Sequence, residues 1–259
     1  MNITITDNQK AEIFTSIFKD IKLFTNDINI MFEPERLYIQ SMDSAHVMLF
    51  EIILPKSWFS KYEITAGSIT VGISSVILSR ILSTRDKSQT IEITYNDDHL
   101  SIHFQSTVKG EFTKHFEAPL IDIDLDMLNI PDIDDNVDIT MESKIFSNLI
   151  NQLKDFGDSV EMVFSEEKII FTANSDEKMS VDIPTEELDS FTINEGSIVK
   201  LMFSLKYLQN ICKYNKISKF IGLKINESHP MKFIYYLTDE TSEDKMVFYL
   251  APKLDDDEN

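Results

Sequence analysis

The chain has 259 residues, of which 42% are hydrophobic and 10% aromatic, and this composition excludes a wholly disordered protein. Its 44 acidic and 24 basic residues give a formal net charge of −20, which excludes a protein that coats nucleic acid through its overall charge. The single cysteine, Cys212, excludes an internal disulfide, and no stretch approaches the roughly 20 apolar residues that cross a bilayer. Since the N-terminus also lacks a signal-peptide pattern, we expect a soluble intracellular protein.

Hydrophobic periodicity predicts helices and strands along the first half of the chain. Apolar residues at helical spacing predict a helix over 8–22, and a shorter helix fits 74–85. Strict alternation of apolar and polar residues predicts strands at 27–32, 37–40, 47–53, 90–95 and 99–104. Polar turns at 33–35 and 96–98 predict hairpins between neighbouring strands.

The second half repeats the first. Helical spacing recurs at 143–154 and 204–216, and strands are predicted at 160–164, 169–173 and 246–250, with a turn at 165–167. An offset of 132 residues places Phe24 on Phe156 and Phe32 on Phe164, and an offset of 130 aligns the later helices and hairpins. A constant offset across helix, turn and hairpin indicates two copies of one domain plan. We therefore predict an α+β protein whose antiparallel sheets are packed on one face by helices.

The four predicted helices concentrate the basic residues of an acidic chain. They hold 10 of the 24 basic residues but only two of the 44 acidic ones, Glu12 and Asp20. The basic residues are Lys10, Lys19, Lys22, Arg80, Arg85, Lys144, Lys154, Lys206, Lys213 and Lys216. Scattered lysines usually mark a solvated helix face, but such a face in so acidic a chain should carry both signs. We favour a positive helical surface that contacts the phosphates of a polyanion without reading its sequence.

Three segments resemble the proliferating cell nuclear antigen (PCNA) family, the sliding clamps of eukaryotes and their viruses. They are LYIQSMDSAHV at 37–47, LIDIDLDMLNIP at 120–131, and YLAPK at 249–253 before an acidic tail. SRIL at 79–82 and FSLKYL at 203–208 match weaker family signatures. The resemblance covers essentially the whole chain.

The resemblance implies two topologically similar clamp domains, with antiparallel sheets outside and helices inside, that close into a homotrimeric ring. It implies an N-terminal domain at 1–119, a connecting loop at 120–136, a C-terminal domain at 137–254 and an acidic tail at 255–259. Such a ring encircles duplex DNA and tethers DNA polymerase and other replication and repair factors. The donated edge strands are expected near 110–117 and 178–183, and the expected location is the nucleus or a viral replication site.

The resemblance also implies which residues face DNA. Lys19, Arg80, Lys206 and Lys213 stand where the family has basic channel residues. The other expected DNA-facing residues come from the basic set on the predicted helices and compensate for positions where this chain departs from the family: Lys10, Lys22, Lys144 and Lys154. Asn148 and Asn151 stand where the family usually has Arg. Glu12, Ile13 and Ser83 replace lysines of the channel, so the lining is expected to hold DNA less strongly. Glu166, with Lys168 two residues on, occupies the position of the family's modifiable lysine.

A pocket for partner peptides is implied under the connecting loop. In the family, a short motif with a glutamine and paired aromatics (a PIP box) folds as a helical turn into an apolar groove. The matching residues are Met42, His46, Val47, Leu49, Leu128, Ile130, Pro230, Tyr249, Ala251 and Pro252. Each of these alone is compatible with core packing, Leu49 especially. Polymerase, clamp loader, ligase and nuclease are the partners that such a pocket implies.

An enzymatic function finds little support in the residues. The run Asp122, Asp124 and Asp126 is similar to a calcium loop, but Met127 replaces the required glycine and Ile133 the terminal glutamate, so an acidic linker is favoured. His99 and His103 share one face of a strand without further ligands, and Cys212 fits a small core residue. The chain has no GxxxxGK loop, so we expect no catalytic residue, metal or cofactor, and ATP hydrolysis would belong to a separate loader.

Two alternatives remain beside the homotrimeric clamp. One is a clamp subunit of a heteromeric ring, or a monomeric viral processivity factor, which only the oligomeric state distinguishes. The other is a metal-dependent nuclease that uses Asp122 and Asp124. The sequence does not identify the polymerase or the loader, nor does it separate a cellular from a viral clamp.

Overall fold

The computed structural model describes residues 1–65, 67–96, 98–124, 127–131, 133–239 and 242–253. Asp97 of the predicted turn at 96–98, Asp126 of the calcium-like run and the acidic tail at 255–259 lie outside the described residues. The chain divides into two compact units. Unit 1 comprises Met1–Ser44, Phe50–Leu128 and Thr241–Met246, and unit 2 comprises Ala45–Leu49, Asn129–Glu240 and Val247–Asn259.

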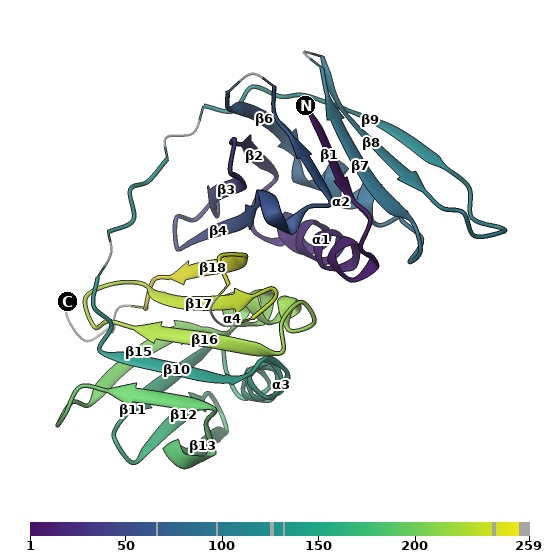
Figure 1. Ribbon diagram of the computed structural model, residues 1–259. Coiled ribbons are helices and arrows are strands. Elements are labelled where there is room, and N and C mark those ends of the chain that lie inside the picture. Colours follow the sequence, from purple (N-terminus) through teal and green to yellow (C-terminus); the bar gives the residue numbers. More distant parts are fainter. Residues whose placement is uncertain (66, 97, 125–126, 132, 240–241, 254–259) are drawn as a thin grey trace. The chain divides into compact units, whose positions relative to one another are not determined.

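The first half of the chain forms two antiparallel sheets and two α-helices (Figure 1). In chain order the elements are β1 (Asn2–Ile5), α1 (Asn8–Asp20), β2 (Asp27–Phe32), β3 (Arg36–Met42), β4 (Met48–Pro55), β5 (Lys61–Glu63), β6 (Ile69–Ser74), α2 (Ser75–Leu82), β7 (Thr90–Tyr95), β8 (His99–Gln105) and β9 (Lys114–Pro119). One sheet has the order β5-β1-β7-β8-β9, and β4, β3, β2 and β6 lie side by side in the other. Strand β9 is therefore the last strand of its sheet among the described residues.

The second half repeats this arrangement element by element. Its elements are β10 (Val137–Glu142), α3 (Ser143–Lys154), β11 (Ser159–Phe164), β12 (Lys168–Asn174), β13 (Lys178–Pro184), β14 (Ser190–Ile193), β15 (Val199–Ser204), α4 (Leu205–Ile211), β16 (Phe220–Ile225), β17 (Met231–Tyr236) and β18 (Lys245–Leu250). Strands β14, β10, β16, β17 and β18 are neighbours in that order, and the other sheet runs β13-β12-β11-β15. Strand β13 is the end strand of that sheet in the described part of the chain.

The structure confirms the internal repeat. Strands β2 and β3 map onto β11 and β12 at an offset of 132, and β6 and β7 map onto β15 and β16 at an offset of 130. Corresponding core positions are buried in both copies: Phe14, Ile17, Phe18 and Ile21 in the first, and Phe146, Leu149, Ile150 and Leu153 in the second. The same apolar spacing therefore produces the same helix and the same contact with the sheets.

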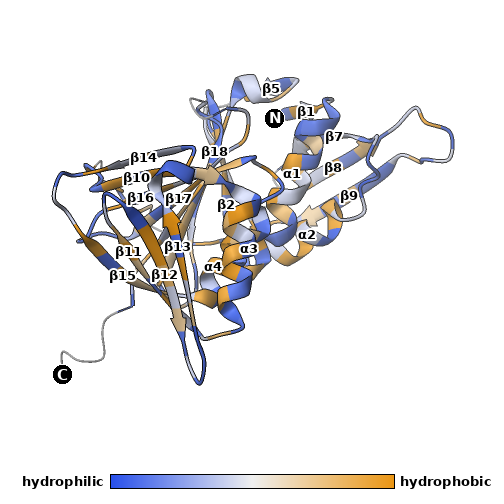
Figure 2. Cartoon of the chain, turned by 90° about the horizontal axis from the view of Figure 1, so that it is seen from below, coloured by the Kyte–Doolittle hydropathy of each residue, from blue (hydrophilic) through white to orange (hydrophobic). Residues whose placement is uncertain are grey.

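The helices pack in pairs, α1 with α2 and α3 with α4, each pair against the strands of its own half. Each helix carries hydrophobic and hydrophilic residues, as Figure 2 shows. Side chains also tie the pairs together: Ser79 Oγ donates to the carbonyl of Lys19 at 2.7 Å, and Asn215 Nδ2 donates to Ser147 Oγ at 3.0 Å. Each pair therefore buries one face and leaves the other to solvent. None of the helices in the described ranges is long and apolar enough to cross a membrane.

Three predicted helices are longer than the observed ones. The helix predicted at 8–22 is α-helical to Asp20 and continues as a 3₁₀ turn, Ile21–Leu23, while the one predicted at 204–216 changes to a 3₁₀ turn at Cys212–Tyr214. The helix predicted at 74–85 is α2, which ends at Leu82, where the hydroxyl of Thr84 donates to the carbonyl of Ile81 at 2.8 Å. The tighter 3₁₀ geometry of a last turn provides hydrogen-bond donors for carbonyl oxygens that have no partner at the end of an α-helix.

Several strands differ from the predicted set. The predicted set omits β1, β6, β10, β15 and β17, although β1 and β10 alternate buried and half-buried residues. It also omits β5 and β14, which bury no residue. The edge expected at 110–117 is corrected to β9, which begins only at Lys114. Gly110 has a φ of 96°, and Glu111 N bonds to Val108 O at 3.2 Å, so the preceding residues form a turn.

Candidate DNA and partner interfaces

Six of the eight expected DNA-facing residues are exposed on the helices. Lys19, Lys22, Arg80, Lys144, Lys206 and Lys213 are all exposed. Within the described chain, none of the six has an ion pair, whereas most other basic residues near carboxylates do. These cations lie opposite the buried faces of their helices, where they are free to contact phosphate oxygens.

Lys10 and Lys154 are placed differently. Lys10 Nζ donates to the carbonyl of Trp58 at 2.9 Å and lies 5.6 Å from the centre of the indole ring. Lys154 forms an ion pair with Asp158, a fully exposed carboxylate whose pKa the hydrogen bond from Lys154 lowers. Both lysines are half-buried and have partners in their own unit.

Arg85 is a basic residue that contributes no free charge to the helical face. Its side chain is completely buried, and Nη1 donates to Glu12 at 3.2 Å. Nε and Nη2 donate to the carbonyls of Gln89 and Lys87 at 2.8 and 3.0 Å. Burial lowers the pKa of this guanidinium, and Glu12 opposes that effect. Arg85 therefore stabilises the fold of unit 1 and is not available to bind phosphate.

The two asparagines expected at family arginine positions are also exposed. Asn148 and Asn151 lie on the solvent side of α3, and Gln209 of α4 donates to Asn151 Oδ1 at 3.1 Å. Ile145, on the same helix, is 54% exposed. The α3 face thus carries neutral residues between Lys144 and Lys154.

In unit 1, the expected peptide-pocket residues Met42 and Leu128 come together at β3, through Gln40. Gln40 and Met42 are two residues apart on this strand and so share one face. The carboxamide of Gln40 holds the backbone of Leu128 from both sides: Nε2 donates to Leu128 O at 3.0 Å, and Leu128 N donates to Oε1 at 2.7 Å. This places Leu128 over the β3 face that carries Met42. Gln40 lies in the predicted strand 37–40 and in the family-like segment 37–47, but no sequence-based expectation names it as a site residue.

In unit 2, a second group of these residues is joined by the backbone. Ala251 N donates to Val47 O at 3.0 Å, and Lys253 N donates to Met202 O at 2.7 Å, which holds the segment after β18 in place. Val47, Leu49, Tyr249, Ala251, Pro252 and Ile130 are half-buried, whereas Pro230 is exposed. His46 is exposed, with a φ of 57°, a left-handed conformation that suits a tight turn.

The connecting loop is fastened at several points in addition to Leu128. Ile121 N donates to Gly72 O at 3.0 Å, and Asn29 Nδ2 donates to Ile123 O at 3.1 Å, both in unit 1. In unit 2, Asn136 N donates to Ile225 O at 2.7 Å. The described residues of the loop form no helix or strand (Figure 1).

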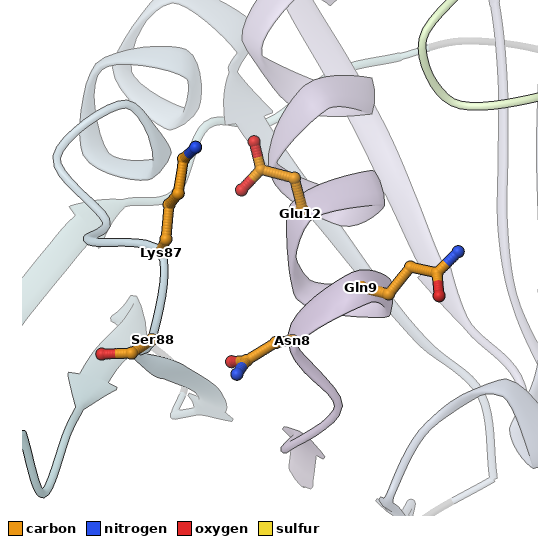
Figure 3. Close-up of a pocket in the computed structure, with 5 residues that line it drawn as sticks. All are labelled: Asn8, Gln9, Glu12, Lys87 and Ser88. Carbon is orange, nitrogen blue, oxygen red and sulfur yellow. The ribbon is translucent and has the colours of Figure 1, made fainter.

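A cavity of about 460 Å³ lies at the start of α1, and Glu12 and Lys87, which contact Arg85, help to line it. Figure 3 shows Lys87 and Ser88 on one wall and Asn8 and Glu12 on the other, with Gln9 pointing away. It is open and bears both charges, so it offers no selective site for an anion or a cation.

The cysteine and the strand histidines have structural surroundings. Cys212 is 2% exposed, and burial raises the pKa of its thiol to about 12. His99 and His103 lie on one face of β8, where His103 contacts His115 of β9 with ring centres 4.5 Å apart. In the part of the chain that the structure describes, no group of three or more His, Cys, Asp or Glu side chains is arranged to hold a metal ion.

Comparison with known proteins gives one consistent result. The family model described as "Proliferating cell nuclear antigen, N-terminal domain" matches residues 6–128, and its C-terminal counterpart matches 129–253. "Proliferating cell nuclear antigen 1" of Plasmodium falciparum is 29% identical over 95% of both chains. "Probable DNA polymerase sliding clamp 2" of Paramecium bursaria Chlorella virus 1 is 30% identical over 95% of this chain and 89% of its own.

A solved structure supports the fold. The "PCNA2-PCNA3 complex from Sulfolobus tokodaii" matches with a TM-score of 0.85 and 21% identity, covering 98% of this chain and 99% of the other. The architecture of the two halves is therefore that of the solved chain.

Proposed function

The chain belongs to the proliferating cell nuclear antigen family and is a DNA sliding clamp, and on that premise we propose that three copies close into a ring around duplex DNA. The observation that carries this proposal is the segregation of charge. Although the chain has a net charge of −20, the helices carry exposed cations that have no ion pair among the described residues. A weakly basic lining retains DNA without immobilising it, and an acidic exterior disfavours contact elsewhere.

The ring contacts are proposed at the end strands β9 and β13. Each leaves one edge of its sheet open within the described residues, and β13 alternates exposed residues with the half-buried Met179, Val181 and Ile183. Pairing of β9 in one copy with β13 in the next satisfies both edges and generates a head-to-tail contact that closes by rotation.

Absolute mass by light scattering behind a sizing column tests this assembly. A chain mass of 29.9 kDa predicts about 90 kDa for the trimer. Val181→Asp places a charge in the paired edge and should shift the mass to that of the monomer, while Thr172→Asp on the neighbouring inner strand β12 is the control. A wild-type mass of about 30 kDa would overturn the homotrimer and favour a heteromeric ring or a monomeric processivity factor.

We further propose that the ring tethers DNA polymerase, clamp loader, ligase and nuclease through peptides with a glutamine and paired aromatics. The supporting observation is that Leu128 lies over the face of β3 that carries Met42, and that Ala251 is bonded to Val47. Ile130→Ala combined with Tyr249→Ala is expected to abolish peptide binding and leave the trimer mass unchanged. Unchanged affinity in calorimetry would contradict this assignment.

The role proposed is that of a scaffold without chemistry of its own, acting in the nucleus or at a viral replication site. The family membership and the eukaryotic and viral relatives support this setting. Magnesium-dependent cleavage of DNA by the purified chain, abolished on replacing Asp122 and Asp124 by Asn, would contradict it.

A further inference from the structure

The side chain of Gln40 pairs with Leu128 as a neighbouring strand would. It receives the N–H of Leu128 at 2.7 Å and donates to the carbonyl of the same residue at 3.0 Å, across 88 positions of sequence. We refer to this pair of bonds as the Gln40 clasp. A backbone donor and acceptor in an irregular segment otherwise depend on water. The clasp therefore fixes both the position and the direction of the chain at Leu128.

The orientation of the Gln40 amide is determined by its neighbours Tyr38 and Glu51. Tyr38, two residues earlier on β3, donates its hydroxyl hydrogen to Glu51, so its oxygen is left to accept from Gln40 Nε2 at 3.2 Å. Burial and the neighbouring Glu51 raise the pKa of Tyr38, and the phenol keeps its proton. The amide nitrogen must face Tyr38, and the amide oxygen is left to receive Leu128 N–H.

Burial makes this arrangement rigid. Gln40 is only 9% exposed, and its two N–H groups have separate acceptors, the Tyr38 oxygen and the Leu128 carbonyl. A buried carboxamide whose two N–H groups both have acceptors loses hydrogen bonds if its nitrogen and oxygen exchange places. In contrast, the side chain of Leu128 is 48% exposed and so lies open to a binding partner.

The clasp also shortens the free length of the connecting loop. Among the described residues, the side-chain and backbone bonds on either side of it are those of Ile123 to Asn29 and of Asp134 to Asn226. The clasp therefore adds an attachment at Leu128, in the stretch of sequence between these two.

We propose that Gln40 is a positioning residue for partner recognition, because it holds Leu128 beside Met42 before the peptide arrives. This inference rests on the proposed peptide-binding function and assigns a role to a residue outside the pocket lining. A preorganised Leu128 side chain lowers the ordering cost of binding. The partner class is unchanged: a peptide that buries apolar side chains at helical spacing.

The test compares Gln40→Met, which keeps the length of the side chain and removes its hydrogen bonds, with Asn29→Ala, which releases the loop at Ile123 only. The probe is a synthetic peptide with a glutamine and two adjacent aromatic residues, titrated calorimetrically into the full-length chain. We expect Gln40→Met to bind about tenfold more weakly, as the loss of two bonds to one residue implies. Asn29→Ala should stay within twofold of the wild type.

Amide hydrogen exchange at Leu128 separates positioning from general damage. Gln40→Met should accelerate exchange at Leu128 and leave the urea midpoint close to that of the wild type, and Asn29→Ala should leave Leu128 protected. If Gln40→Met does not fold, Gln40→Glu replaces it, since a carboxylate still accepts from Leu128 N–H but cannot donate to the carbonyl.

The outcomes distinguish the two levels of the proposal. A wild-type chain that binds the peptide no more tightly than Gln40→Met overturns the positioning role alone, as does equal weakening by Asn29→Ala. A wild-type chain that does not bind the peptide overturns the proposed partner site, and the positioning role with it.

Discussion

Arg85 buries its side chain completely, yet gives one guanidinium N–H to Glu12, an exposed residue 73 positions earlier in the chain. The pair joins the end of α2 to α1 inside unit 1. The pair also reduces the net positive charge of the helical face, because Glu12, one of the two acidic residues in the predicted helices, balances the charge of Arg85. The exposed face depends on the remaining lysines and on Arg80.

Glu12→Lys should destabilise the protein, although it adds a basic residue to the helical face. The new ammonium would face the buried guanidinium of Arg85, which loses its charge partner. We expect a loss of about 1–3 kcal/mol in the free energy of unfolding, measured by urea denaturation. Glu12→Gln, which keeps an acceptor oxygen, is the control and should lose less. Wild-type stability in Glu12→Lys would contradict the structural role of the pair.

Two serines at the first position of a helix are expected to respond oppositely to alanine. Ser143 Oγ is buried and has no hydrogen-bond partner in the described structure, so Ser143→Ala should leave stability unchanged or raise it by about 1 kcal/mol. Ser75 Oγ donates to the carbonyls of Thr25 and Asn26 at 2.6 and 2.9 Å, and Ser75→Ala should cost about 1–2 kcal/mol. Urea midpoints of the two variants provide the measurement, and equal shifts would contradict the difference.

Alkaline pH should destabilise the protein through Cys212. Burial raises the pKa of its thiol to about 12, above the ordinary value near 9.0, so the folded state keeps a proton that the unfolded state releases. The contribution is full below pH 9 and is lost as pH rises toward 12. Between pH 8 and pH 10 the wild type should lose about 1 kcal/mol more than Cys212→Ala in urea denaturation. Parallel losses in both proteins would refute this assignment.

DNA binding should weaken with salt and respond to single cations on the helices. Lys206→Ala and Arg80→Ala are each expected to reduce the slope of log affinity against log salt by about one for any DNA sequence, because each removes a cation that neutralises one phosphate. Lys200→Ala changes the same charge on strand β15, where Lys200 is paired with Glu161 at 2.8 Å, and should leave the slope unchanged. Equal effects of all three variants would indicate attraction by net charge alone.

Several elements with one-sided burial could be predicted from the sequence, although β1 and β10, which are also one-sided, were not. The helix α3 coincides with the predicted 143–154 because its buried residues recur at helical spacing. The strands β2 and β7 coincide with 27–32 and 90–95 because buried and half-buried positions alternate along them. Strands β5 and β14 are only three and four residues long and bury none of them, so a repeating pattern is too short to identify them. Helix ends shifted because turn hydroxyls, such as that of Thr84, bond to carbonyls that a further helical turn would otherwise satisfy.

Part of the candidate sites could be predicted from the sequence. Charge on the helices identified exposed cations such as Lys19 and Lys206, but did not separate them from Lys10, whose ammonium turns to the carbonyl of Trp58. The resemblance supplied Met42 and Leu128, but not Gln40, since a glutamine within a strand has no feature that reveals its partner.

By itself, the sequence determined the two-fold repeat, the pairing of helices with antiparallel strands and the segregation of basic residues onto helices. These properties follow from periodic burial and net charge, which act along neighbouring residues. The tertiary structure alone decided which polar groups meet, as Gln40 does with Leu128 and Arg85 with Glu12. Such pairs depend on where segments many residues apart are brought together, because a buried hydrogen-bonding group is stabilised only by a partner at the right distance.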